Sequence, residues 1–340
     1  MAKLMHPRDL QPGQEVRGLR IVRRLDQGCF GLVFEVEEKS GHRLALKFAS
    51  HREVHDDSYR IVSHLQREMV CLLGLNHPYI VRIWGSGYWP GPDKGYRYMV
   101  QDLVEGDMLD RWAERTHPTP HELVVLLDKI CSALEHMHGR KTVHRNLNSW
   151  NIVVRSGNEP VLIDFSVGDF WPAENLRNEV LPPWAPRYPS PEAVLFWRQI
   201  RHDPDARYSF QETDEIYALG ALLYDVLTQF KPREAREIEP RGNPLLVPAS
   251  PLEVTQGRVP PALSDFTLKL MARDPRERPA HASELRRMLA DLSRREGQMW
   301  HTPFYPPPAP EPPAPMGAAR MLAALARVVP QLRGRGRRPW

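Results

Sequence analysis

The residues of this sequence that could do chemistry gather in two short stretches, residues 142–154 and 161–166. The first holds one imidazole, one guanidinium and three carboxamides between His144 and Asn151, and the second holds the carboxylate of Asp164. A carboxamide donates and accepts hydrogen bonds but has no useful basicity. The first stretch therefore offers hydrogen bonding without a carboxylate base.

A glycine-bearing turn is a second candidate. It joins two segments of alternating apolar residues, 19–25 and 32–36, which predict two strands. Gly28 and Gly31 would let backbone N–H groups approach phosphate oxygens, which a Cβ would obstruct. A hairpin turn that binds no ligand explains the same pattern.

Taken in order, these stretches resemble the glycine-rich loop, the catalytic loop and the metal-binding turn of eukaryotic-type Ser/Thr protein kinases. The resemblance covers about residues 19 to 292. It implies an α+β fold with two lobes: a small β-rich lobe that carries one helix, and a larger, mainly helical lobe. It also implies ATP and Mg²⁺ as cofactors.

The resemblance assigns a nucleotide site to four side chains. Lys47 takes the position of the phosphate-gripping lysine. Glu68, on an amphipathic helix expected over residues 58–74, takes the position of the acid that orients this lysine. Asn151 and Asp164 take the positions of the metal ligands. Taken singly, Lys47 and Glu68 would be ordinary solvated residues.

The segment 101–106 resembles the hinge between the lobes. By this resemblance Gln101 is the gatekeeper, and the Asp102 carbonyl and Val104 N–H face an adenine edge. A connector without a ligand is the plainer interpretation. Asp26 replaces the first glycine of the family's loop, and a carboxylate there would weaken nucleotide binding.

The departures from the family pattern fall on the substrate side. Asn146 stands in place of the Asp that accepts the proton of the substrate hydroxyl, Asn148 in place of a lysine, and Ala185 in place of a threonine. Residues 167–189 contain no Ser or Thr, so the usual phosphorylation switch is missing. Three hypotheses follow: a pseudokinase that acts as a signalling or scaffolding module, a slow Ser/Thr kinase, and a docking platform at a membrane surface or on a partner.

Further patterns predict the frame of the fold. Residues 43–48, 79–84 and 96–100 read as strands, and 120–139 and 214–224 as helices. Glu192 and Arg278 match an acid and an arginine that pair in Ser/Thr kinases. We expect five segments. These are an N-terminal extension at 1–18, the small lobe at 19–101, the large lobe at 102–297, a proline-rich linker at 298–316 and a basic amphipathic tail at 317–340.

Composition suits a protein of the cytoplasm. The 340 residues are 41% hydrophobic, and three cysteines at unrelated spacings favour a reducing compartment without a zinc site. The N-terminus lacks the apolar run of a signal peptide, and no stretch approaches the roughly 18 apolar residues of a spanning helix.

The tail carries most of the positive charge. Residues 316–340 hold six Arg and no acid, while the whole chain has a net charge of +4, so the body is not basic and nucleic acid is not an expected partner. Leu322, Leu325 and Val329 lie on one helical face. This pattern predicts association with an anionic membrane at its inner surface, and docking on the kinase body or on a partner explains it equally well. RNA binding is a weaker alternative, and the sequence names no protein partner or substrate.

Overall fold

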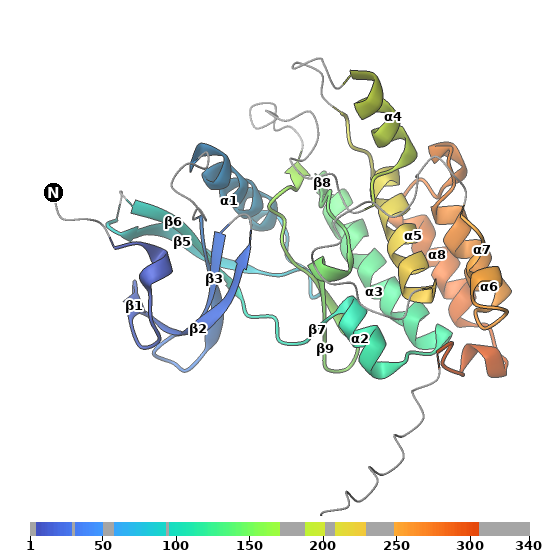
Figure 1. The fold of residues 1–340 in the computed structure, drawn as a ribbon, viewed down its shortest axis with the longest axis horizontal. Helices are drawn as coiled ribbons and strands as arrows, with labels where there is room; N and C mark the ends of the chain where they lie inside the picture. The colour runs from blue at the N-terminus through green and yellow to red at the C-terminus, as the bar shows by residue number, and fades with distance from the viewer. Residues whose placement is uncertain are drawn as a thin grey trace, which may run out of the picture. The chain divides into compact units, whose positions relative to one another are not determined.

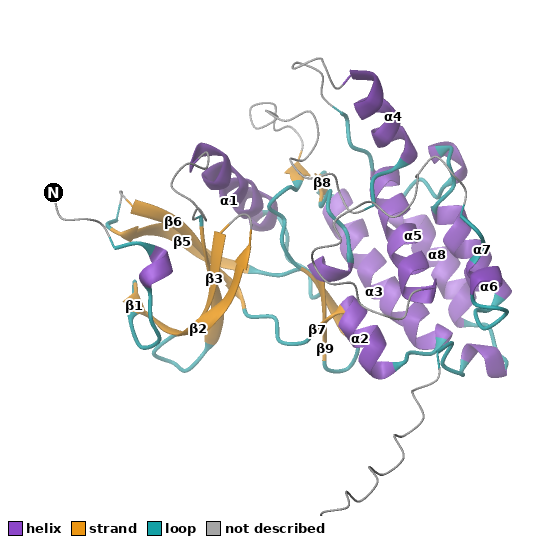
Figure 2. Cartoon of the chain, in the orientation of Figure 1, coloured by secondary structure: helices purple, strands orange, loops and turns teal. Residues whose placement is uncertain are grey.

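A β-rich lobe is followed along the chain by a helical lobe (Figures 1 and 2). The computed structural model describes residues 5–28, 31–49, 58–92, 95–170, 188–200, 208–228 and 248–305. All of the described residues belong to one compact unit, which ends at Tyr305. The predicted membrane-binding tail and Ala185 therefore lie outside the described residues.

The small lobe is a six-stranded antiparallel sheet with the strand order β1-β2-β3-β4-β6-β5. Its strands are β1 (Glu15–Val16), β2 (Leu19–Gly28), β3 (Gly31–Glu37), β4 (Arg43–Phe48), β5 (Ile83–Pro90) and β6 (Gly95–Asp102), preceded by the 3₁₀ helix η1 (Pro7–Asp9). Helix α1 (Ser58–Leu73) packs Leu65 and Met69 against Met99 of β6. The predicted strand at 43–48 and the predicted helix at 58–74 are confirmed.

The strand predicted at residues 79–84 is wrong, because β5 begins only at Ile83. Ile80 forms an isolated bridge with Leu162, and Val81 N donates to Leu162 O at 3.0 Å. The apolar pattern before Ile83 reflects burial of Ile80 and Val81 in the core of the large lobe. The observed strand β5 continues through Gly85 and Gly87, although glycine is uncommon in strands.

The large lobe is mainly helical. Its helices are α2 (Leu109–Thr116), α3 (Pro120–His138), α4 (Pro191–Ile200), α5 (Glu212–Thr228), α6 (Pro251–Val254), α7 (Pro261–Leu270) and α8 (Ala282–Ser293), with 3₁₀ helices η2 (Ser149–Asn151), η4 (Pro275–Glu277) and η5 (Gln298–Trp300). Its short strands are β7 (Asp107–Met108), β9 (Ile152–Arg155) and β10 (Glu159–Leu162), which form one sheet, and β8 (Thr142–Val143) paired with β11 (Asp169–Phe170).

Two helices form the centre of this lobe. Helix α3 begins at a capping box, in which Thr119 and Glu122 each bond the other's backbone N–H through a side-chain oxygen. Helix α5 is buried at every position from Asp214 to Leu223. A Cβ at Gly220 would lie 2.6 Å from the Cβ of Leu270, so only glycine permits this approach of α5 to α7.

The compact unit continues past the expected end of the large lobe at residue 297. Trp300 and Phe304, which the sequence suggests belong to the linker, are buried in the core of this lobe. Within the described ranges, no helix is long and apolar enough to cross a membrane.

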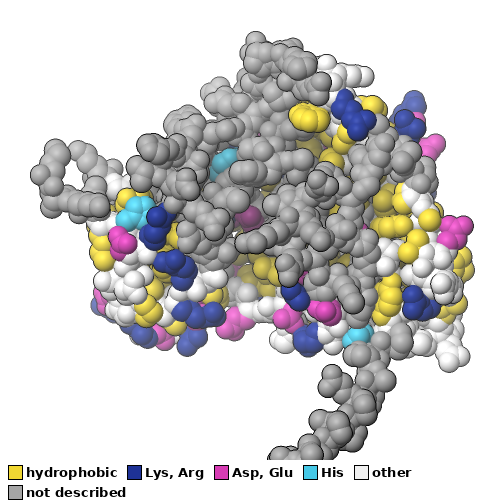
Figure 3. Space-filling view, viewed as in Figure 1, with side chains coloured by type: hydrophobic (Ala, Val, Ile, Leu, Met, Phe, Trp, Pro, Cys, Tyr) yellow, Lys and Arg dark blue, Asp and Glu magenta, His cyan; other side chains and the backbone are white. Residues whose placement is uncertain are grey.

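Basic side chains of the small lobe are interspersed with acidic ones (Figure 3). Glu35 is 1% exposed, and its two carboxylate oxygens form ion pairs with Arg23 Nε and Arg43 Nη1, each at 2.6 Å. The charge on this part of the lobe is therefore largely paired.

A buried ion pair fastens α4 to the turn that follows η4. Arg278 donates through both terminal nitrogens to Glu192, at 2.7 and 2.8 Å, and its side chain is fully buried. It also bonds the carbonyls of Ala272 and Thr213. The predicted pairing of Glu192 with Arg278 is confirmed.

We expect Arg278→Ala to destabilise the fold by about 3–5 kcal/mol, because it leaves the Glu192 carboxylate partly buried without its partner. Urea denaturation measures the change as a lower midpoint. Arg276→Ala is the matched control, since Arg276 lies in the same turn, pairs with Asp274 and is 87% exposed. It should leave the midpoint unchanged, and an equal loss in both variants would contradict the argument.

Candidate functional site

Lys47 joins the two lobes. Its ammonium lies 2.6 Å from Glu68 Oε2 on α1 and 3.0 Å from Asp164 Oδ1, just after β10. The Lys47 and Glu68 side chains are 10% and 0% exposed. Three residues assigned from the sequence to one site are thus in direct contact, although 117 positions separate the first from the last.

Charge and burial shift the pKa values of these groups. Burial alone would lower the pKa of Lys47, but the carboxylates of Asp164 and Glu68 outweigh it and raise the pKa above its usual value. Burial would raise the pKa of Asp164, yet the Lys47 ammonium holds it below the usual range. For Glu68 burial dominates and raises the pKa to about 7. The charge of Lys47 is therefore balanced first by Asp164.

Asp164 is oriented by contacts on both sides. Its backbone has φ = 61°, a left-handed conformation that an Asp adopts more readily than most residues. The next residue, Phe165, is fully buried with its ring centroid 4.6 Å from that of His144. His64 of α1 bonds the carbonyl of Ser166 at 2.9 Å. The sequence analysis missed His64, because a single polar residue on a helix carries no signal.

Asn151 ends η2 with its carboxamide oriented by the catalytic loop. Its Nδ2 donates to the backbone oxygen of Asn146 at 2.8 Å. The donor end of the amide is therefore engaged, and the oxygen end is left to act as a ligand. Asn151 and Asp164 fit the needs of Mg²⁺, a hard cation that takes one or two protein oxygens and completes its shell with water and phosphate.

Asn146 and Asn148 form a pair of carboxamides. Asn148 Nδ2 lies 3.0 Å from Asn146 Oδ1 and 2.9 Å from the backbone oxygen of Asn146. Asn148 Oδ1 accepts from Trp150 N at 2.9 Å, and the residue is buried. Asn148 therefore caps η2 and holds Asn146, and it carries no charge toward a phosphate.

The backbone of the catalytic loop is fixed by a buried acid on α5. Glu215 Oε1 accepts from His144 N at 2.6 Å and from Arg145 N at 2.8 Å. Glu215 Oε2 lies 2.6 Å from His138 Nε2, and His138 Nδ1 lies 3.3 Å from Glu212. The sequence analysis predicted a helix at residues 214–224 but assigned no role to Glu215. Glu215 stands with Glu212 and Asp214 in the first turn of α5, where acids are common, so the sequence carried no signal that singles it out.

Arg145 has a carboxylate partner within the described residues. Its Nη1 lies 3.5 Å from Asp169 Oδ2, and its guanidinium lies 5.9 Å from the ring centroid of Phe210. Neither partner belongs to residues 171–187, the part of the Ser- and Thr-free segment 167–189 that lies outside the described residues.

The glycine turn and the hinge are placed by the small-lobe sheet. Gly28 and Gly31 pair at the end of the hairpin, and Gly31 has φ = 152°, a conformation that side-chain-bearing residues rarely adopt. Asp102 ends β6, where its carboxylate accepts from Trp84 Nε1 at 2.6 Å and from Arg82 N. Val104 packs against the core of the large lobe. The side chain of Asp26 lies outside the described residues.

Two apolar residues that the sequence analysis did not single out share the sheet face of Lys47. Val33 is directly opposite Lys47 in the register of β3 and β4, and Ala45 precedes Lys47 by two positions. Opposite residues of an antiparallel pair point to the same face, as do alternate residues of a strand. Val33 and Ala45 therefore lie where a flat apolar group beside Lys47 would pack.

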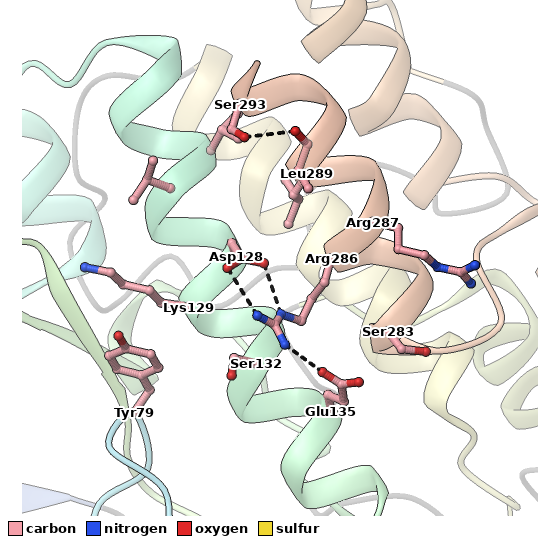
Figure 4. Close-up of a pocket in the computed structure, with 13 residues that line it drawn as sticks. Tyr79, Asp128, Lys129, Ser132, Glu135, Ser283, Arg286, Arg287, Leu289 and Ser293 are labelled. Carbon is pink, nitrogen blue, oxygen red and sulfur yellow. Dashed lines mark hydrogen bonds and ion pairs between the residues drawn. The ribbon is translucent and has the colours of Figure 1, made fainter. Parts of the chain in front are cut away.

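A groove of about 690 Å³ lies elsewhere, between α3 and α8 (Figure 4). Arg286 crosses it, bonding Asp128 and Glu135 of α3 at 3.0 Å each. No predicted site residue lines this groove. We interpret it as a gap in helix packing that Arg286 bridges.

In a protein kinase, a strand lysine is held by a glutamate on a helix and by an aspartate of the other lobe, and the catalytic loop is fixed to a buried helix. This site has the same architecture. The comparison with known families agrees, because the model described as "Protein kinase domain" matches residues 19–289. The chain belongs to this family, and the expected eukaryotic-type Ser/Thr kinase fold is confirmed.

Three relatives illustrate the similarity. The serine/threonine-protein kinase PknD of Mycobacterium tuberculosis is 28% identical over 282 residues, which cover 81% of this chain and 40% of the relative. The serine/threonine-protein kinase pkn3 of Myxococcus xanthus is 26% identical, covering 84% and 51%. Aurora kinase of Saccharomyces cerevisiae is 28% identical, covering 75% and 64%. The chain thus spans less than two thirds of the length of each relative.

The network below the catalytic loop predicts a pH dependence of stability. Burial alone would lower the pKa of His138, but Glu212 and Glu215 outweigh it and raise the pKa to about 9. A group whose pKa is higher in the folded than in the unfolded state stabilises the fold. This stabilisation is complete below the unfolded pKa, near 6.5, and is lost as the pH rises past the folded pKa. The stabilisation is on the order of 3 kcal/mol at low pH.

We therefore expect the stability difference between the unaltered chain and His138→Gln to shrink as the pH rises from about 6 to about 9. Urea denaturation at several pH values measures this difference. His136→Gln is the control, because burial lowers the pKa of His136 on the same helix. A difference for His138→Gln that stays constant with pH would argue against a charged His138.

Proposed function

We propose that this chain is a protein-kinase-fold module that binds ATP with Mg²⁺ and is impaired in phosphoryl transfer, so that it acts as a pseudokinase in signalling or scaffolding. The observation that carries this proposal is the contrast between the two halves of the site. Charged groups are assembled where a nucleotide would bind, and only carboxamides stand where a hydroxyl would be activated.

The nucleotide half supports binding through its charges. The Lys47 ammonium is held by Glu68 and Asp164, so its position is set before any ligand arrives. Phosphate oxygens would therefore bind an ammonium group that is already held in position. Mg²⁺, bound through Asn151 and Asp164, would neutralise phosphate charge, while Val33 and Ala45 offer an apolar surface to the base.

The hydroxyl half supports impairment. The Asn146 carboxamide cannot take a proton, and its oxygen already accepts a hydrogen bond from Asn148. A general base contributes about 10²–10⁴ in rate. Asn148 supplies no positive charge to stabilise a transferring phosphoryl group. Both losses act on the same step.

A slow but active Ser/Thr kinase is the second candidate. It is favoured by the ion pair between Lys47 and Glu68 and by the buried Phe165, which leave the nucleotide half fully assembled. In this function the site would act by alignment and by metal-assisted charge neutralisation, without a strong base.

We expect millimolar ATP with Mg²⁺ to raise the midpoint of thermal unfolding, because a ligand of the native state stabilises it by mass action. Lys47→Ala and Asp164→Asn should each reduce this rise. Lys129→Ala is the matched control, since it breaks a pair with Glu159 at 2.7 Å in the large lobe. It should keep the rise caused by the nucleotide. Nucleotide binding at this site would be refuted if the midpoint of the unaltered chain did not rise, or if Lys47→Ala and Asp164→Asn left the rise unchanged.

Phosphoryl transfer by the unaltered chain should be near background in a radiolabelled ATP assay. Asn146→Asp alone should recover little, because Asn148 would still supply no positive charge to the transferring phosphoryl group. Asn146→Asp, Asn148→Lys and Ala185→Thr together should recover more than the sum of the single changes. Robust transfer by the unaltered chain, abolished by Asp164→Asn, would favour the slow-kinase function instead.

A further inference from the structure

Helix α1 contacts the turn that follows Asp164 at a second point, besides the contact made through Lys47. Nδ1 of His64 lies 2.9 Å from the backbone oxygen of Ser166. A carbonyl oxygen only accepts hydrogen bonds, so Nδ1 carries the proton and donates. Both residues are buried, so the bond is shielded from water, which strengthens it.

The two contacts of α1 lie one helical turn apart. His64 precedes Glu68 by four residues, so both side chains point to the same face of the helix. Glu68 reaches Asp164 through the Lys47 ammonium. His64 instead bonds the turn directly. Together the two contacts set both the distance and the rotation of α1 relative to the turn.

The turn transmits the position of Ser166 to Asp164. Gly168 N donates to Phe165 O at 2.9 Å, which closes a tight turn. A Cβ at Gly168 would lie 3.0 Å from Phe165 O and 3.2 Å from Cys71 Sγ of α1, so the turn packs closely against the helix. The buried ring of Phe165 anchors the one residue between Asp164 and Ser166. A shift of the Ser166 carbonyl therefore moves the Asp164 carboxylate.

We propose that His64 is a positioning residue for the metal ligand Asp164, and that its bond to the Ser166 carbonyl holds the carboxylate in place for Mg²⁺. Removing a contact that orients a metal ligand from outside costs about 10–100-fold in metal affinity. His64 acts through a backbone carbonyl and not on the ligand itself, so we expect the lower end of this range. This inference rests on the proposed nucleotide binding.

The test compares the dissociation constant of ATP measured with Mg²⁺ with the constant measured in EDTA. The ratio of the two constants is the gain in affinity that the metal provides. His64→Leu should reduce this gain by about tenfold, because Asp164 loses its orientation, and should leave the affinity in EDTA nearly unchanged. A purely structural role of His64 would weaken binding equally in both solutions.

Two polar variants separate the hydrogen bond from the imidazole ring. His64→Asn places its amide nitrogen close to the position of Nδ1, so it should keep most of the gain. His64→Gln carries its amide one bond further out and should lose the gain as His64→Leu does. This pair decides the question even if His64→Leu does not fold. Val70→Ala, at an exposed position of the same helix, is the control and should keep both constants.

Equal gains in His64→Asn and His64→Gln, whether kept or lost, would overturn this inference while leaving nucleotide binding intact. A loss in EDTA as large as the loss with Mg²⁺ would also overturn it, because His64 would then support the fold and not the metal ligand. So would an unaltered chain that binds ATP but gains nothing from Mg²⁺. Failure of the unaltered chain to bind ATP in either solution would refute the proposed function and this inference together.

Discussion

The rest of the site depends on the two contacts that the ammonium group of Lys47 makes. It holds a helix of the small lobe through Glu68 and a turn of the large lobe through Asp164. Without this cation, the buried carboxylate of Glu68 and the partly buried carboxylate of Asp164 would repel each other, and water or a proton would have to enter to relieve the repulsion. The position of α1 and the conformation of Asp164 are therefore coupled through one side chain, and each lobe helps to order the other.

The catalytic loop is held by a different kind of interaction. The backbone oxygen of Asn146 accepts from the carboxamides of both Asn148 and Asn151, and backbone N–H groups of the same loop donate to Glu215. Main-chain atoms at position 146 would be present with any residue there. The frame of the loop therefore tolerates a change of side chain at this position. This explains how an ordered site can persist where the base has been replaced.

Sequence patterns predicted the parts of the structure that depend on local order and on motif spacing. The helices at 58–74 and 120–139 carry long apolar stripes, and Lys47, Glu68 and Asp164 follow the spacing of a family. Contacts between distant polar residues could not be read in this way. His138 of α3 and Glu215 of α5 meet only because the fold brings these two positions together, and the apolar residues at 79–84 belong to the core of the large lobe.

The attachment of Asp102 has a consequence for motion between the lobes. Its backbone N–H donates to Arg82 O, and its carboxylate is bonded to Trp84 on the neighbouring strand, so Asp102 moves with the small-lobe sheet. Asp107 already pairs with β9 of the large lobe. A rotation of one lobe against the other must therefore be absorbed by the dihedral angles of residues 103–106, with the pivot a few ångströms beyond the end of β6.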